Sequence, residues 1–192
     1  MDRAAVEFLK AAARRPLGVA TVFPTSRALA ERMVEAAASS PTDGVVELGA
    51  GTGAITRHLV SGARGRVTAL EIDPEMARFL GVRFPEVQVV CSGAEDLSKL
   101  VAPRSVGAVV ASLPWTMLPL LTQERILAAV RTVLVPGGIF ATYLCLNAYM
   151  HPKARTFGGR MRAHFTRVEE GPIEWRNLPP AVPWCAWTPR QP

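Results

Sequence analysis

The chain has 192 residues and a net charge of +6, so it is long enough for one domain with its own hydrophobic core, and its charge favours an anionic partner such as a phospholipid surface or nucleic acid. Its three cysteines, Cys91, Cys145 and Cys185, are widely spaced, which argues against a disulfide framework and against a zinc site. The sequence shows neither the apolar core of a signal peptide nor a run of about 18 apolar residues, so we expect neither export nor a membrane span.

Two helices are predicted at the start of the chain. Over Asp2 to Arg15, apolar residues recur at helical spacing on one side and basic residues lie roughly opposite. After a linker, a second helix runs to about Ala38, with Thr25 or Ser26 as its N-cap.

The rest of the chain alternates short apolar runs with helical stretches. The apolar runs are Val45–Leu48, Val67–Leu70, Val87–Val90, Val106–Ala111 and Ile139–Leu144. This βαβα pattern predicts a mostly parallel sheet in an α/β, Rossmann-like fold with helices on both faces. A helix is expected over Thr122–Leu134, with Val135-Pro136-Gly137-Gly138 as a sharp stop before the next strand. The tail from Pro172 is rich in Pro and Trp and predicts an edge strand or a packed lid.

A glycine-rich turn separates the first predicted strand from the helix after it. The turn is Gly49-Ala50-Gly51-Thr52-Gly53, and glycines there let the backbone approach a nucleotide. Together with Ala54, the same residues fit the dinucleotide pattern of dehydrogenases, so a nicotinamide cofactor is an alternative.

Three further features favour S-adenosylmethionine. Glu47 places a carboxylate before the glycines, where it would repel a pyrophosphate but resembles the acidic residue of methyltransferase motif I. Glu71 ends the next strand, where a carboxylate can accept hydrogen bonds from ribose hydroxyls. Ser112-Leu113-Pro114-Trp115 follows the fourth strand and resembles methyltransferase motif IV. Turn chemistry, a surface charge and packing would explain each feature singly, but their order along the chain points to one nucleotide site.

The adenine ring is expected near Ser92-Gly93-Ala94-Glu95, after the third strand. Many related enzymes carry Gly-Asp-Ala at this turn, whereas the acids of this chain are displaced to Glu95 and Asp96. The residues predicted to contact the cofactor are Thr25, Ser26, Glu47, Gly49, Gly51, Thr52, Gly53, Glu71, Ile72, Gly93, Ala94, Glu95, Ser112, Leu113 and Pro114.

Over nearly its whole length the chain resembles the bacterial phospholipid N-methyltransferases, which methylate phosphatidylethanolamine. The matching stretches are Val22-Phe23-Pro24-Thr25-Ser26, Ala28-Leu29-Ala30, Glu47 to Gly53, Leu113-Pro114, Val135-Pro136-Gly137-Gly138 and Trp175-Arg176-Asn177-Leu178-Pro179-Pro180-Ala181. The resemblance implies a seven-stranded class I methyltransferase that acts on an amine-bearing lipid. It implies a cytoplasmic enzyme held peripherally at an anionic membrane, with residues 1–40 as helices over the cofactor and membrane face and residues 41–192 as the core.

Methyl transfer needs an unprotonated amine and close alignment. Tyr143 and Tyr149, with His151 as a further candidate, could accept a proton or hydrogen-bond the amine, and Trp115 could stabilise the developing ammonium. The lipid phosphate would be met by Lys153, Arg155 and Arg176, with Arg160 as a further candidate. Aromatic residues at strand ends also occur commonly in cores, and single arginines on surfaces often have no specific partner.

Three other functions remain open on the sequence. Methyltransferases acting on RNA adenine share the N-terminal helix and a Leu-Pro-aromatic motif IV, but their motif begins with Asn where this chain has Ser112, and we see no RNA-binding C-terminal domain. The acceptor could instead be a soluble metabolite of a biosynthetic pathway. A fold that only binds a nucleotide is disfavoured by the presence of both carboxylates.

Overall fold

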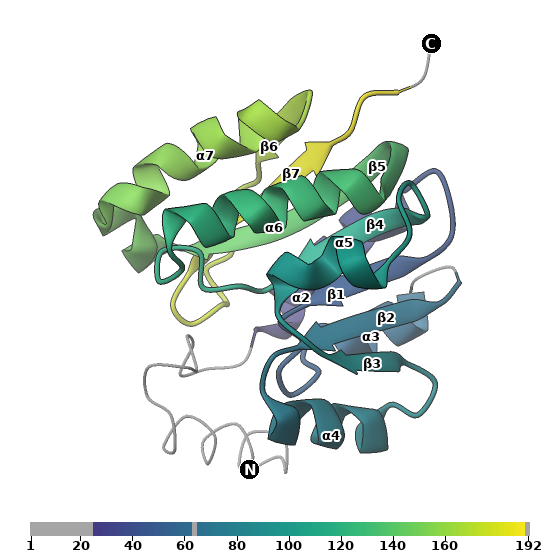
Figure 1. The fold of residues 1–192 in the computed structure, drawn as a ribbon. Coiled ribbons are helices and arrows are strands. Elements are labelled where there is room, and N and C mark those ends of the chain that lie inside the picture. Colours follow the sequence, from purple (N-terminus) through teal and green to yellow (C-terminus); the bar gives the residue numbers. More distant parts are fainter. Residues whose placement is uncertain (1–24, 63–64, 191–192) are drawn as a thin grey trace.

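The molecule is built on a seven-stranded sheet with the strand order β3-β2-β1-β4-β5-β7-β6 (Figure 1). A computed structural model of the chain describes residues 25–62 and 65–190, so the helix predicted over Asp2 to Arg15 lies outside the described residues. The strands are β1 (Val45–Leu48), β2 (Val67–Glu71), β3 (Gln88–Cys91), β4 (Val106–Ala111), β5 (Leu134–Cys145), β6 (Arg167–Glu170) and β7 (Ala181–Trp187). Neighbouring strands from β3 to β5 are parallel and β7 is antiparallel to both of its neighbours, which confirms the mostly parallel sheet.

Helices cover both faces of the sheet, because each face buries its own apolar cluster. The helices are α2 (Arg27–Ala38), α3 (Thr56–Gly62), α4 (Pro74–Arg83), α5 (Leu97–Leu100), α6 (Leu120–Val133) and α7 (Pro152–His164), with short 3₁₀ turns η1 (Ala94–Asp96) and η2 (Leu146–Met150). One cluster joins the strands to α2, α3 and α4, and the other joins them to α5, α6 and α7. The central strand β1 is buried throughout, as expected for a parallel strand covered on both faces.

Local sequence signals explain where the helices begin. The Ser26 hydroxyl accepts a hydrogen bond from the backbone N–H of Leu29 at 3.3 Å, which confirms a predicted N-cap of α2. Asp73 caps α4 in the same way, and Pro74 occupies the first helical position, where its missing N–H costs nothing.

Two predictions about the second half of the chain were wrong. The tail does not add an edge strand, because β7 lies between β5 and β6 and is almost entirely buried; β6 forms the edge instead. The Val135-Pro136-Gly137-Gly138 stretch lies within β5, where it produces a register shift against β4, and is not a stop before the strand. The sheet tolerates the irregularity because Gly137 adopts a φ of +74°, which a residue with a side chain rarely adopts.

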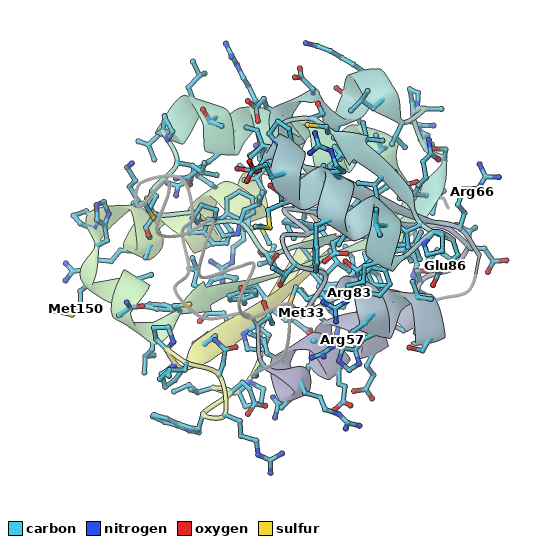
Figure 2. The ribbon with its side chains drawn as sticks, turned by 90° about the horizontal axis from the view of Figure 1, so that it is seen from below. Met33, Arg57, Arg66, Arg83, Glu86 and Met150 are labelled. Carbon is cyan, nitrogen blue, oxygen red and sulfur yellow. The ribbon has the colours of Figure 1, made fainter. Side chains whose placement is uncertain are left out.

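The parallel strands bring several distant segments to one edge of the sheet. In Figure 1 the start of α6, the start of α7 and the loop before β7 all lie at the left, where the parallel strands end. We call this the carboxyl edge. Figure 2 shows Met150 at the opposite side of the molecule from Arg66 and Glu86, which precede β2 and β3. Among the described residues, no helix has both the length and the apolar character needed to cross a membrane.

Candidate active site

The glycine-rich turn follows β1 at the carboxyl edge and is held by the end of β2. The backbone N–H of Gly51 donates to Glu71 Oε2 at 2.8 Å, with Gly51 at a φ of +54°. A Cβ placed on Gly51 would meet no atom within 4 Å, so open space adjoins the turn. The turn therefore presents bare backbone to a ligand, as a nucleotide site requires.

Glu71 links the glycine turn to the start of α4. Its second oxygen, Oε1, accepts from the backbone N–H of Asp73 at 2.9 Å, and the side chain is 8% exposed. Each carboxylate oxygen keeps a second lone pair for a ligand hydroxyl. The neighbouring Ile72 is 68% exposed and offers apolar surface beside this carboxylate. This arrangement suits a ribose next to a flat aromatic ring.

Glu47 lies fully buried beneath the same turn. Its Oε2 accepts from the Thr56 hydroxyl at 2.6 Å, whereas Oε1 has no hydrogen-bond partner among the described residues. Burial raises the pKa of the Glu47 carboxyl to about 8; the Thr56 hydrogen bond opposes the shift, and the nearby Glu71 charge adds to it. An unpartnered buried oxygen with such a pKa would be stabilised in its charged form by a cationic ligand.

The motif IV residues are held against the glycine turn by a hydrogen bond and by close packing. The Ser112 hydroxyl donates to the carbonyl oxygen of Gly49 at 2.7 Å. A Cβ on Gly49 would come within 2.9 Å of the Leu113 side chain, so glycine permits this close approach. The ends of β1 and β4 are thus fixed relative to each other, which places Ser112, Leu113 and Pro114 beside the cofactor turn.

The turn expected to hold adenine also joins this cluster. The backbone N–H of Ser92 donates to the carbonyl oxygen of Glu71 at 3.0 Å, which brings Gly93 and Ala94 next to β2. Glu95 is exposed on η1, while Asp96 forms an ion pair with Lys99 at 2.6 Å. Of the two displaced acids, Glu95 is thus the one exposed beside this turn.

The remaining residues predicted to contact the cofactor lie partly at the glycine-rich turn and partly at the start of α2. Thr52 is 5% exposed, and its carbonyl oxygen accepts from Arg83 at 3.1 Å; Gly53 continues the turn into α3. The side chain of Ser26 serves as the cap of α2. Thr25 lies 3.1 Å from the Tyr143 phenol, oxygen to oxygen, at the acceptor side of the site.

A pocket of about 530 Å³ opens beside the motif IV residues. Its lining is mostly apolar. The polar residues in the lining are Ser112, Thr116, Tyr143, Asn147 and His151. The other lining residues are Leu113, Pro114, Trp115, Met117, Leu144, Cys145, Ala148, Leu178 and Pro179. Burial raises the pKa of the Tyr143 phenol to about 12, so the phenol stays protonated at neutral pH. The pocket can therefore enclose a small polar group and offer it hydrogen bonds.

Trp115 forms part of the packed wall of this pocket. It is 2% exposed, its indole N–H donates to the Thr142 hydroxyl at 2.7 Å, and its ring packs against Phe140 and Phe157. Contact between its ring and an ammonium remains a prediction. Tyr149 is half-buried; its phenol oxygen accepts from the Trp184 indole N–H at 3.1 Å and lies 3.5 Å from Glu170. Tyr149 does not line the pocket, so its predicted catalytic role stays a prediction.

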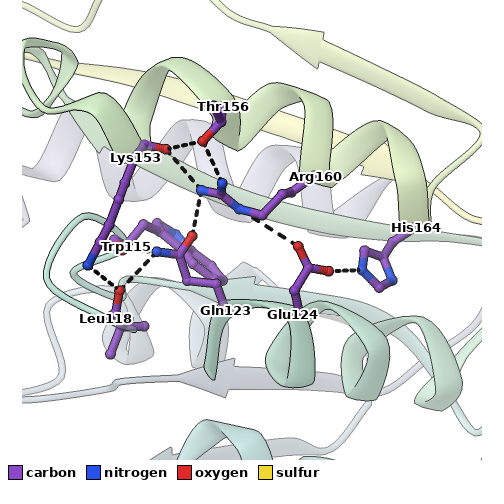
Figure 3. Close-up of polar contacts among 8 residues, drawn as sticks. All are labelled: Trp115, Leu118, Gln123, Glu124, Lys153, Thr156, Arg160 and His164. Carbon is purple, nitrogen blue, oxygen red and sulfur yellow. Dashed lines mark hydrogen bonds and ion pairs between the residues drawn. The ribbon is translucent and has the colours of Figure 1, made fainter. Parts of the chain in front are cut away.

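A polar network from α6 and α7 holds the loop that carries Trp115 (Figure 3). The buried Gln123 amide donates to the carbonyl oxygens of Trp115 at 2.6 Å and Leu118 at 3.1 Å. Arg160 donates to Gln123 Oε1 at 2.7 Å and to the carbonyl oxygen of Lys153 at 2.9 Å. The Lys153 ammonium donates to the carbonyl oxygen of Leu118 at 2.9 Å.

This network already uses some of the residues predicted to bind a lipid phosphate. Lys153 and Arg160 already have protein partners, whereas Arg155 on α7 and Arg176 in the loop before β7 are exposed. His151 caps α7 through its ring Nδ1 and also lines the pocket.

The sequence reasoning missed Gln123 and Asn177, which are both nearly fully buried. Gln123 shares the apolar stripe of Ile126, Leu127 and Val130, and a lone amide in such a stripe signals a buried polar contact. Asn177 accepts from the backbone N–H of Ser26 at 2.9 Å and donates to the carbonyl oxygen of Pro179, and so ties the loop before β7 to the start of α2.

Comparisons with known proteins agree with this geometry. Residues 45–138 match the family model described as a methyltransferase domain. The ornithine lipid N-methyltransferase of Singulisphaera acidiphila is 32% identical over 171 residues, which cover 85% of each chain. This chain belongs to the class I S-adenosylmethionine-dependent methyltransferases. Its cofactor is S-adenosylmethionine, and the open glycine turn, Glu71 and the unpartnered oxygen of Glu47 fit that molecule.

Three further similarities to this methyltransferase are partial or concern the fold alone. The ribosomal RNA small subunit methyltransferase A of Chlorobium chlorochromatii is 37% identical over 79 residues, which cover 41% of this chain and 29% of that one. A SAM-dependent O-methyltransferase of Thermotoga maritima superposes with a TM-score of 0.66 at 16% identity and covers 93% of this chain and 71% of that one. A 16S rRNA N2 G1207 methyltransferase of T. thermophilus, solved with AdoMet and guanosine, gives 0.62 at 18% identity, over 86% and 40% of the two chains.

Proposed function

We propose that this methyltransferase methylates the primary amine of a membrane aminolipid, with phosphatidylethanolamine and ornithine lipid as the two head groups to test first. The observation that carries the proposal is the 32% identity with an ornithine lipid N-methyltransferase over 85% of both chains. The ribosomal RNA methyltransferases match a smaller share of their own length, 29% in the case given above and 52% for that of Synechococcus elongatus. Ser112 uses its hydroxyl to hold Gly49, where the RNA adenine enzymes carry an asparagine.

The pocket beside motif IV suits an amine acceptor. An alkyl amine has a pKa near that of lysine, about 10.4, so in water at neutral pH it is mostly protonated and cannot act as a nucleophile. Transfer into the mostly apolar pocket disfavours the ammonium and lowers the pKa of the amine. The protonated Tyr143 phenol can donate to an acceptor oxygen or accept from the amine, and Asn147 adds an amide at the same wall.

Bound S-adenosylmethionine supplies the methyl group as part of a sulfonium. The task of the protein is to align the amine and release its proton. Because Tyr143 stays protonated, a neutral amine must enter or form in the pocket, and the proton lost after transfer passes to solvent through the pocket mouth. We further propose that Arg155 and Arg176, both exposed at the carboxyl edge, contact the lipid phosphate or carboxylate.

The proposal also places the enzyme at the cytoplasmic face of a membrane as a peripheral protein. A water-soluble cofactor and an acceptor anchored in a bilayer can meet only at the bilayer surface.

The experiment offers the purified enzyme radiolabelled S-adenosylmethionine and four acceptors: phosphatidylethanolamine vesicles, ornithine lipid vesicles, a mixture of free ethanolamine and ornithine, and ribosomal RNA. We expect label in the organic phase and mass increases of methylated lipid, and much less label with Glu71→Ala at a limiting concentration of the cofactor. Label that stays in water with the free amines, or enters RNA, contradicts the aminolipid proposal and leaves the methyltransferase family unaffected.

A further inference from the structure

Large apolar side chains protrude around the mouth of the acceptor pocket. Of the nine exposed large apolar residues found among the described residues, six lie on three segments at the carboxyl edge. These segments are residues 112–123 around the start of α6, residues 146–155 over η2 and the start of α7, and residues 175–180 before β7. The six residues, which we call the rim, are Met117, Leu120, Leu121, Met150, Trp175 and Leu178.

The rim is continuous with the pocket. Met117 and Leu178 line the pocket itself, although they are 50% and 58% exposed. Met150 is 84% exposed and precedes His151, another lining residue. The three segments lie together at the left of Figure 1, and Figure 2 shows Met150 projecting from that side of the molecule. At Met117 and Leu178 the border of the pocket is therefore both apolar and exposed.

The charges on the same segments are of one sign. Residues 112–123, 146–155 and 175–180 include three basic residues, Lys153, Arg155 and Arg176, and no aspartate or glutamate. The two acids that border these ranges have basic partners elsewhere: Glu124 contacts Arg160 and His164, and Glu174 pairs with Arg32. Arg155 and Arg176 are exposed. Single apolar side chains interspersed with cations match the interfacial layer of an anionic bilayer, where apolar groups insert near the acyl chains and cations remain near phosphates.

We propose that the rim docks this enzyme on an anionic bilayer, with the acceptor pocket facing the head groups. The inference rests on the proposed function for its biological purpose, because only a lipid acceptor requires the pocket mouth to face a membrane. The docking itself can be measured without any methyl transfer. It adds a membrane contact within residues 112–180 to any contact that the N-terminal residues make.

The test uses one substitution from each segment, none of them in the pocket lining. The triple variant Leu121→Ser, Met150→Ser, Trp175→Ser is compared with the wild type and with Val82→Ser, an 82% exposed apolar residue on α4. All are full-length chains, so any contribution of the N-terminal residues is common to them. In co-sedimentation with vesicles of phosphatidylcholine and phosphatidylglycerol, we expect the triple variant to bind about tenfold more weakly or worse, and Val82→Ser to bind like the wild type. Equal binding of the triple variant and the wild type would overturn the proposal.

Trp175 provides a second measurement. Among the four tryptophans, Trp115 and Trp184 are buried and Trp187 is half-buried, whereas Trp175 is 68% exposed. We expect a blue shift of tryptophan emission when anionic vesicles are added, and loss of that shift in Trp175→Phe, which keeps an apolar ring at the same position. A shift that persists in Trp175→Phe excludes insertion of this residue and contradicts the proposal.

Assays with two forms of the acceptor test docking by the rim separately from the proposed methylation of an aminolipid. The triple variant should lose most activity on aminolipid in anionic vesicles and keep wild-type activity on a short-chain aminolipid dispersed as monomers. If the wild type methylates neither form, the proposed function fails, while the sedimentation result still decides the rim. If the rim instead joins two copies of the chain, the wild type will be a dimer, the triple variant a monomer, and their vesicle binding equal, which also overturns the proposal.

Discussion

The side-chain amide of Gln123 lies 2.6 Å from the carbonyl oxygen of Trp115, so a buried residue of α6 fixes the loop that forms one wall of the pocket beside motif IV. The same amide reaches the carbonyl oxygen of Leu118, and Arg160 orients it from α7. Two helices that are distant in sequence thereby set the position of the motif IV loop. Gln123 and Arg160 are positioning residues, since neither lines the pocket.

Replacing Gln123 with methionine should misplace this loop while keeping the side-chain volume. The Trp115 carbonyl oxygen would lose its Gln123 donor, at a cost of about 1 to 3 kcal/mol for a buried group, and Arg160 would lose an acceptor, whereas the Leu118 carbonyl oxygen keeps Lys153. We expect kcat/KM for the acceptor to fall about tenfold or more while the affinity for the cofactor stays within about twofold. Thr132→Ala, an exposed substitution on the same helix, is the control for helix stability. Loss of thermal stability without any change in acceptor kinetics would assign Gln123 a structural role only.

The cofactor site should depend on the charge of Glu71. Glu71→Gln keeps the size of the side chain but removes the carboxylate that accepts from Gly51 and Asp73 and faces the expected ribose. A hydrogen bond to a charged group is worth about 1.5 to 3 kcal/mol, so calorimetry should show binding of S-adenosylmethionine and of its demethylated product weakened about tenfold or more. Glu86→Gln, an exposed change at the other edge of the sheet, should leave both affinities unaltered. Unchanged affinities in Glu71→Gln would exclude the ribose role.

The sequence was sufficient for the parallel part of the sheet because its signals are local and repeat along the chain. Apolar runs such as Val106–Ala111 coincide with β4, and the glycine turn falls where strand and helix patterns meet. The placement of β7 could not be predicted this way, because its pairing with β5 and β6 joins segments distant in sequence. For the same reason the links from Thr25 to Tyr143 and from Ser26 to Asn177, over 118 and 151 residues, were not foreseen.

Tyr143 should act as a hydrogen-bonding group and not as a general base. Burial holds the pKa of its phenol at about 12, so the phenol does not ionise in the range where the enzyme would be assayed. Tyr143→Phe should lower kcat about tenfold, the value of one hydrogen bond of roughly 1 kcal/mol or slightly more, without moving the pH dependence of kcat/KM. A pH profile that loses its basic limb in Tyr143→Phe would show that the phenol does titrate during catalysis.

The stability of the protein should fall with rising pH because of Glu47. The carboxyl has a pKa of about 8 when folded, against an ordinary value of 4.5, so between these pH values the unfolded chain loses a proton that the folded chain keeps. The contribution of Glu47 to stability is therefore fully present below about pH 4.5 and is lost as the pH rises to about 8, at a rate of at most about 1.4 kcal/mol per pH unit. Glu47→Gln cannot ionise but keeps an oxygen that can accept from Thr56. The measurement is the free energy of unfolding in urea of the cofactor-free wild type and of the cofactor-free Glu47→Gln variant. The wild type should lose stability relative to the variant from about pH 5 to about pH 8, and the difference between the two should then level off. A difference that stays constant over this range, with Glu86→Gln as the matched exposed control, would show that Glu47 is ionised in the folded protein.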